Sequence, residues 1–411
     1  MSKTKIKKIQ ARKLRDMTGQ PAIEIDVLLR YGAHGRVATA LPPSAHRPSA
    51  EIDSCIAYIN DRLHSQLKGK SAHDQSAVDQ WLADAGCGAE ANPLLAPVLN
   101  TVSSACLWAM ADTEKLPLWQ YLGTFLGQGP ADTLPLPTLT VYTAQQLGSG
   151  PRCIERFSVI PVGAGSFAEA LNWAESVRTE ALQSVIEPGA GDEQILKILI
   201  RAIEKVRLRP AQDMGIAIKI ATPASRQQGH YQFHGQDSLF STDTLSGKFV
   251  DWVSTYPIVS IEDPFADDDL EGYRRLTWAA GKRVQVIANP EMGPGLFAAT
   301  DGVFKNAGNA LRLSANRSQS ISDIRSLKQL ADQGAASCLL PLALGGQLQT
   351  TAIHLAVGWG VPQICTAPDK TATTMLNWNE GQRIAEILSA ISPESCPVDG
   401  GLPARRGFAW G

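Results

Sequence analysis

From about residue 156 onward the chain repeats one pattern, a short apolar run followed by an amphipathic stretch, and no other feature constrains the fold as strongly. Runs of this length are typical of buried strands, and the stretches between most of them have helical spacing. The alternation predicts parallel strands joined by crossover helices, and this many repeats favours a closed barrel over an open sheet. The runs are RFSVIPV (156–162), GIAIKIA (215–221), PIVSIED (257–263), RVQVIAN (283–289), NALRLSA (309–315), ASCLLPL (336–342) and PQICTA (362–367). Helices are expected near 166–185, 193–206, 243–255, 269–279, 321–334, 349–358 and 371–391.

The first part of the chain has a different pattern. Apolar residues alternate with polar ones between Ile23 and Leu29, which predicts antiparallel strands within the first forty residues. An apolar stripe from Ile52 to Leu63 predicts a helix, and three more helices are expected near 74–84, 93–111 and 117–126. The Gly/Pro-rich segment 127–137 marks the domain boundary. We therefore predict an α/β protein, with an N-terminal α+β domain at 1–130 and a TIM-like β/α barrel at 134–411.

Composition limits the function classes. The formal net charge is −2, so bulk electrostatics favours neither nucleic acid nor an anionic membrane as a partner. No apolar run approaches the roughly 18 residues of a membrane span, and the basic N-terminus lacks the apolar core of a secretory signal. Seven scattered cysteines without a C-x-x-C motif favour reduced thiols over disulfides. We expect a cytoplasmic protein.

Several segments resemble enolases, in the order in which enolases carry them. These segments are ARKLRDMTGQPAIEIDV (11–27), LPLPTLTV (134–141), FSVIPVGAGSFAEAL (157–171) and YPIVSIEDPFADDDLEGYRRLT (256–277). The similarity runs from about residue 5 to residue 390, and the chain is identified as a member of the enolase (phosphopyruvate hydratase) family. The resemblance implies an enolase-like N-terminal domain and barrel. It also implies a homodimer, because enolases dimerise and the region around Arg12 resembles theirs.

The resemblance also implies where a metal site would lie. Enolases dehydrate 2-phosphoglycerate: a Lys removes a proton, two magnesium ions hold the intermediate, and a Glu protonates the leaving hydroxyl. The three carboxylates that hold the first magnesium align with Lys219, Glu262 and Asn289, so only Glu262 is retained. Their charges sum to zero, which predicts an internal Lys219–Glu262 ion pair and no metal cofactor. Two alternatives stay open: Lys219 as a reactive amine in a cleft, and a metal site that recruits Glu291 or Asp263.

The catalytic positions of the family are also changed. The base, the loop histidine, a glutamate of the acid region, the proton-donating glutamate and the substrate lysine align with Ser314, Leu147, Arg156, Glu193 and Cys365. Glu193 nominally matches, but the residues that would position it are missing, so helix capping in the first turn is favoured for it and for Asp192. Glu155 is open to two interpretations, a shifted carboxylate or half of a Glu/Arg pair on the surface or pocket wall.

Two substrate-binding loops differ as well. The phosphate loop aligns with PLALGGQ (341–347), which has no Arg or hydroxyl group and keeps only a glycine pair. The loop that closes over substrate and ligates the second magnesium aligns with PPSAHRPSAE (42–51). Ser44 stands at its ligand position, but the shortened, proline-rich segment argues against the same closure.

The leading interpretation is a pseudoenolase, an enolase-fold protein without dehydration activity that acts through binding or as a scaffold. A second is an enzyme of changed, metal-independent chemistry that uses Lys219, Glu262, Glu155 and Arg156 on a small anionic or carbonyl substrate. A third is a residual magnesium-dependent phosphopyruvate hydratase. A protein partner is not identified by the sequence. The tail, residues 392–411, is either a docking peptide or packs on the barrel.

Overall fold

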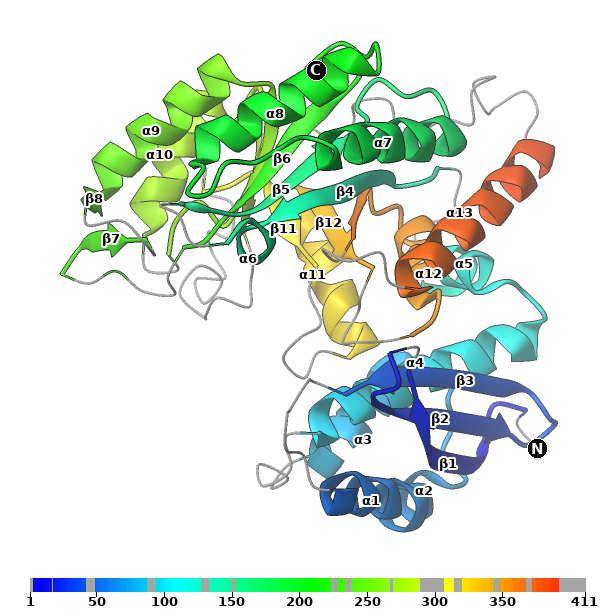
Figure 1. Ribbon diagram of the computed structural model, residues 1–411. Coiled ribbons are helices and arrows are strands. Elements are labelled where there is room, and N and C mark those ends of the chain that lie inside the picture. The colour runs from blue at the N-terminus through cyan, green and yellow to red at the C-terminus, as the bar shows by residue number, and fades with distance from the viewer. Residues whose placement is uncertain are drawn as a thin grey trace.

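The structure is a computed structural model, and Figure 1 shows it with a small sheet-and-helix domain below a larger barrel. It describes residues 3–16, 18–41, 49–86, 94–126, 133–148, 152–222, 226, 228–233, 238–266, 269–288, 307–313, 320–342, 348–366 and 372–391. Of the predicted boundary segment 127–137, residues 127–132 lie outside the described residues and Leu136 begins a strand, so the division into 1–130 and 134–411 stays a prediction. No helix in the described ranges is long and apolar enough to cross a membrane.

The N-terminal domain is an antiparallel three-stranded sheet with helices on one face. Its strands, in sheet order, are β1 (Ile6–Arg15), β2 (Pro21–Leu29) and β3 (His34–Ala40). Its helices are α1 (Ser49–Ala57), the π-helix η1 (Tyr58–Leu63), α2 (His64–Leu67), α3 (Gln75–Gly86), α4 (Leu95–Glu114), α5 (Leu118–Tyr121) and the π-helix η2 (Leu122–Leu126). Helix α4 packs very closely on the sheet at Gly35. A Cβ at this position would lie 1.9 Å from the Ala105 carbonyl oxygen, so the contact requires a glycine. The predicted strands and helices of this part are confirmed.

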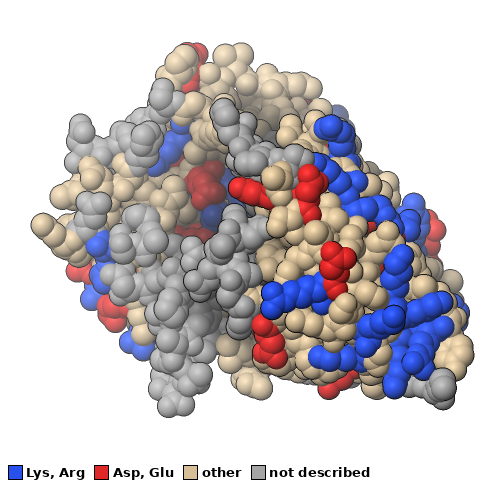
Figure 2. All heavy atoms as spheres, turned by 90° about the horizontal axis from the view of Figure 1, so that it is seen from below, with Lys and Arg blue, Asp and Glu red and all other residues tan. Residues whose placement is uncertain are grey.

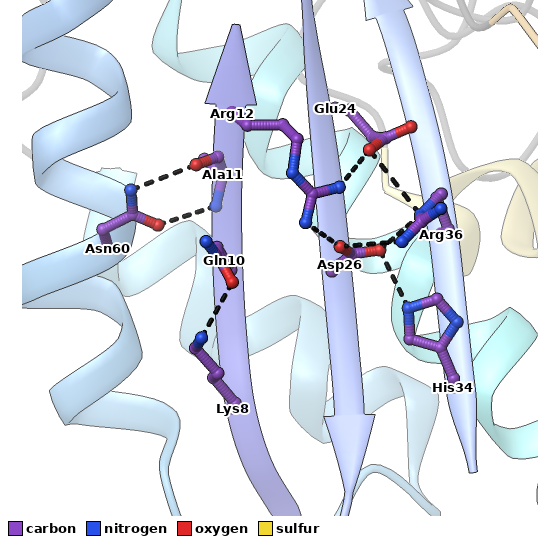
Figure 3. A network of polar contacts seen from close by, with 9 residues as sticks. All are labelled: Lys8, Gln10, Ala11, Arg12, Glu24, Asp26, His34, Arg36 and Asn60. Atoms are coloured by element: carbon purple, nitrogen blue, oxygen red, sulfur yellow. Dashed lines mark hydrogen bonds and ion pairs between the residues drawn. The ribbon is translucent and has the colours of Figure 1, made fainter. Parts of the chain in front are cut away.

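The other face of this sheet carries a network of charged side chains (Figure 3). Arg12 contacts Glu24 and Asp26, while Arg36 Nε and His34 Nε2 lie 2.7 and 2.8 Å from Asp26 Oδ1. Burial opposes ionisation of Asp26, but hydrogen bonds from Arg36, Arg12 and His34 lower its pKa to about 2. Asp26 therefore stays ionised at neutral pH.

Positive charge is unevenly spread, despite the small net charge of the chain. Figure 2 shows Lys and Arg side chains gathered at one side of the N-terminal domain when the molecule is seen from below. A β-bulge between Ile6 and Lys8 breaks the strand alternation, so that Lys7 and Lys8 are both exposed. The sequence pattern did not predict this concentration of charge.

The predicted closed barrel is confirmed, and eight strands form it. In chain order they are β4 (Leu136–Thr143), β5 (Ile154–Ile160), β6 (Gly215–Ile220), β9 (Ile258–Glu262), β10 (Gln285–Ala288), β11 (Ala310–Arg312), β12 (Ser337–Pro341) and β13 (Gln363–Cys365). The helices around them are α6 (Ala144–Leu147), α7 (Phe167–Leu182), α8 (Asp192–Lys205), α9 (Thr242–Thr255), α10 (Leu270–Ala280), α11 (Ile321–Gln333), α12 (Thr351–Gly358) and α13 (Ala372–Ile391). A two-stranded hairpin of β7 (His230–Gln232) and β8 (Leu239–Ser241) precedes α9. Each helix predicted for the barrel is present.

The prediction that all barrel strands are parallel is wrong for β5, which runs antiparallel to both β4 and β6. Only ten residues separate Thr143 at the end of β4 from Ile154 at the start of β5, and a parallel crossover needs a dozen or more. The start of β5 therefore lies at the same rim as the ends of the other strands. This rim is called the mouth below.

A buried polar cluster joins the two domains. Asp79 of α3 accepts hydrogen bonds from the Ser322 backbone N (2.9 Å) at the start of α11 and from Ser103 Oγ of α4 (2.5 Å). Gln75 Nε2 lies 3.1 Å from the same carboxylate. The N-terminal domain thus supplies hydrogen-bond acceptors to a barrel helix, where the helix dipole favours a carboxylate.

Candidate site at the barrel mouth

Strand register places three of the predicted pocket residues side by side at the mouth. Arg156 near the start of β5 pairs with Lys219 on β6, and Lys219 pairs with Glu262 at the end of β9. The reversed direction of β5 is what brings Arg156 and its neighbour Glu155 to this rim. A search confined to the C-terminal ends of strands would therefore miss both residues.

Glu262 is buried and held by two arginines. Arg312 Nη1, from β11, donates a 2.8 Å hydrogen bond to Glu262 Oε1, and Arg156 Nη2 lies 3.8 Å from the same oxygen. Burial raises the pKa of Glu262, but Arg312, Arg156 and Lys219 together outweigh it and lower the pKa below its ordinary value. Glu262 is therefore an ionised carboxylate whose counter-charge comes from the protein.

The predicted Lys219–Glu262 ion pair is wrong in its partners. Lys219 Nζ lies 2.9 Å from Glu155 Oε2 and 3.7 Å from Asp263 Oδ2. The Arg312 and Arg156 guanidinium groups approach Glu262 instead, and Lys219 contacts the two neighbouring carboxyl groups. The sequence pattern did not reveal this arrangement. Glu155 accordingly pairs with a lysine on the adjacent strand, not with Arg156 as one interpretation had it.

Asp263, directly after Glu262, is a buried carboxyl group in an unusual backbone conformation. The residue is 3 % exposed, its φ is 53°, and its Oδ1 has no hydrogen-bond partner. The Thr222 hydroxyl donates to its backbone oxygen (2.5 Å), which helps to hold the left-handed conformation. Burial, followed by the charge of Glu262, raises the pKa of Asp263 to about 7. Its position directly after Glu262 in SIEDP was the available signal.

The described mouth residues do not fit the magnesium ion that the resemblance implies. Magnesium prefers oxygen ligands in a near-octahedral arrangement, and Glu262 Oε1 already faces two guanidinium groups. Arg156, Lys219 and Arg312 already place three positive charges among the carboxyl groups of Glu155, Glu262 and Asp263. Within the described ranges, no group of three or more His, Cys, Asp or Glu residues is arranged to hold a metal. Asn289, Glu291 and Ser44 lie outside the described residues.

Below the ion pairs, the barrel interior encloses a cavity of about 20 Å³. Its lining includes Arg156, Ser158, Lys219, Glu262, Gln363 and Cys365. A volume of this size holds about one water molecule. Gln363 Oε1 is buried without a hydrogen-bond partner in the structure, which suits a bound water. Cys365, the aligned substrate-lysine position, is buried, and its Sγ lies 3.7 Å from Arg312 Nη1.

Two further predicted site residues are described by the structure, Glu193 and Leu147, and their hydrogen bonds go to residues outside this cluster. Glu193 lies in the first turn of α8, as expected, and its two oxygens face Trp252 Nε1 and Tyr256 Oη at 3.3 Å each. Leu147 ends α6, and its carbonyl oxygen accepts a hydrogen bond from Arg152 (3.3 Å). Ser314 and the glycine pair at 345–346 lie outside the described residues.

A comparison with protein-family models supports the resemblance seen in the sequence. The model described as "Enolase, C-terminal TIM barrel domain" matches residues 188–393, which is half of the chain. This range contains β6 and β9 to β13, and so Lys219, Glu262 and Arg312, while the closed barrel provides the matching architecture. The chain belongs to the enolase family.

Proposed function

We propose that this enolase-family protein has lost magnesium-dependent dehydration of 2-phosphoglycerate and acts as a pseudoenolase, through binding or as a scaffold. The observation that carries the proposal is the Glu262 carboxylate with Arg312 and Arg156 directed at it. A magnesium ion at Glu262 would have to displace a buried, charge-assisted hydrogen bond and would meet the repulsion of three cationic side chains.

The chemistry explains why this substitution matters. Removing a proton next to a carboxylate creates a second negative charge, and metal ions stabilise it by several kcal/mol. The arginines at the mouth carry positive charge, but they cannot accept the proton, because a guanidinium stays protonated in proteins. Ser314, which aligns with the catalytic lysine, offers a hydroxyl group in place of an amine. Neither the two arginines nor Ser314 therefore replaces the lysine that serves the family as a base.

The experiment is a spectrophotometric assay of phosphoenolpyruvate formation from 2-phosphoglycerate with magnesium. The expected result is no rate above that of buffer, from protein shown to be folded by circular dichroism. Turnover that is lost with EDTA and in Glu262→Gln would overturn the proposal and establish the residual hydratase. The matched control is Glu204→Gln, an exposed glutamate on α8 away from the mouth.

A second candidate function is metal-independent chemistry on a small anionic or carbonyl substrate. The observation that favours it is the unpartnered Asp263 Oδ1, buried beside Lys219, because a buried polar atom without a partner is typical of functional sites. A thermal-shift screen of small carboxylates and carbonyl compounds in EDTA tests it. Stabilisation that disappears in Lys219→Met supports this function over a purely scaffolding one.

We also propose a cytoplasmic homodimer. The support is family membership together with the charged sheet face of Arg12, Glu24, Asp26 and Arg36 (Figure 3), which presents both signs of charge to a second copy. Sedimentation equilibrium gives the test: a dimer that weakens with salt and in Arg36→Ala is expected, and a salt-independent monomer contradicts it.

A further inference from the structure

A groove of about 790 Å³ lies between the start of α7 and the C-terminal half of α13. Residues 165–169 line one side, and Gln382, Ala385, Glu386, Ser389 and Ala390 line the other. Helix α7 follows the end of β5, where Ile160 pairs with Gly215 at the start of β6. The groove is therefore at the rim opposite the mouth and is separate from the cluster around Glu262.

The floor of the groove is apolar and tightly packed. Phe167 is 1 % exposed, and its ring lies edge-on to that of Trp378 with centroids 6.1 Å apart. A Cβ at Gly381 would lie 2.5 Å from the Phe167 ring, so this glycine is what lets α13 approach α7 closely. Small residues, Ala168 and Ala385, leave space above this floor. An aromatic or aliphatic side chain fits such a surface.

The walls carry negative charge. Glu169 and Glu386 line the groove, and its described lining contains no Lys or Arg. Glu169 Oε2 accepts a hydrogen bond from the Gly165 backbone N (2.7 Å), which holds one carboxylate at the first turn of α7. Glu386 is exposed on α13. The groove therefore favours a cationic segment that also carries apolar side chains.

We propose that this groove binds the C-terminal tail of the same chain, residues 392–411. The tail lies outside the described residues and begins directly after α13, two residues beyond Ala390 of the groove wall. Its sequence joins two cations, Arg405 and Arg406, to two aromatic residues, Phe408 and Trp410. The arginines pair with Glu169 and Glu386, and an aromatic ring covers the apolar floor.

The length of the tail permits this return. Thirteen residues, 392–404, separate the end of α13 from Arg405, and such a segment spans up to about 40 Å when extended. A tethered segment of this length has an effective concentration in the millimolar range, so a site with a dissociation constant below that range is largely filled. A second copy of the chain would have to compete with this local concentration.

The test is limited trypsin digestion of the full-length protein, with cleavage after Arg405 and Arg406 followed by mass spectrometry. Cleavage of a folded-back segment tracks its open population, so we expect cleavage about tenfold or more slower than in a synthetic 392–411 peptide. Glu169→Gln/Glu386→Gln is expected to raise the rate toward that of the peptide. Glu386→Gln alone, at an exposed site that spares the α7 turn, is expected to give part of this increase. The control Glu204→Gln on α8 leaves the rate unchanged.

Three results would overturn the inference. One is cleavage in the wild-type protein at the rate of the free peptide. Another is slow cleavage that neither glutamine variant accelerates. The third is protection that grows with protein concentration, because that dependence would place the tail in the groove of a second copy.

Discussion

Arg312 on β11 reaches over the intervening strand β10 to donate a 2.8 Å hydrogen bond to Glu262 on β9. The contact joins the carboxylate that we predict to align with a metal ligand of the family to a cation supplied by the protein. It lies at a buried position, so the pair is weakly screened by salt and each partner depends on the other. The mouth of this barrel is thus organised by side-chain ion pairs.

Arg312→Met is expected to destabilise the protein by about 3–5 kcal/mol, because it leaves Glu262 buried with a weaker counter-charge from Arg156. Urea denaturation measures the change. The double variant Arg312→Met/Glu262→Gln should recover most of the loss, since it removes the buried charge as well. A single variant within about 1 kcal/mol of wild type would show that the Arg312–Glu262 contact contributes little.

Asp79→Ala is expected to loosen the attachment of α11 to the N-terminal domain. It removes the acceptor of the Ser322 amide and of the Ser103 hydroxyl, while Gln75 keeps its hydrogen bonds to Ser103, and the cost is about 1–3 kcal/mol. Hydrogen exchange at Ser322 is the measurement, and faster exchange is expected there. Asp84→Ala, an exposed change on the same helix, is the control. Equal exchange in both variants would rule out a role for Asp79 at this interface.

His354→Gln is expected to remove part of the acid sensitivity of the fold. Burial lowers the pKa of His354 to about 4, although Glu380 acts in the opposite direction. The unfolded chain therefore binds more protons than the folded chain between about pH 6.5 and pH 4, and the contribution of His354 is lost as the pH falls through this window. The full effect corresponds to about 3 kcal/mol.

The measurement for His354 is the difference in unfolding free energy between wild type and variant across this pH range. Asp192 changes the pH dependence of stability in the opposite direction. Burial raises its pKa to about 6, so the free-energy cost of burying its ionised form is relieved as the pH falls. The effect of Asp192 is the same in wild type and variant, so it cancels in the difference between their unfolding free energies. A difference that is constant from pH 7 to pH 4.5 would contradict the assignment.

Local patterns predicted the barrel well because each strand and helix has its own periodicity. The seven apolar runs and the helices between them were found where the pattern placed them. The direction of β5 was missed, since the apolar run 156–162 reads the same whichever way the strand points. Its short connection from Thr143 was the physical signal, and it requires knowing where β4 ends.

The site was predictable only in part. Alignment with the family predicted one pocket for Arg156, Lys219 and Glu262, and strand register places these three residues side by side. Which carboxylate pairs with which cation depends on side-chain reach across strands. Arg312 is therefore the nearest partner of Glu262, although Lys219 is its neighbour in register. The position of the unpartnered Asp263 Oδ1 depends on a positive backbone φ, which the sequence does not reveal.

The most direct test of the central claim is an anomalous difference map from crystals soaked in Mn²⁺ as a substitute for Mg²⁺. The account predicts that the Arg312 guanidinium remains on Glu262, with no peak at coordination distance, about 2.0–2.2 Å, from its carboxylate. An ordered ion bound to Glu262, with Arg312 and Lys219 turned away, would contradict it.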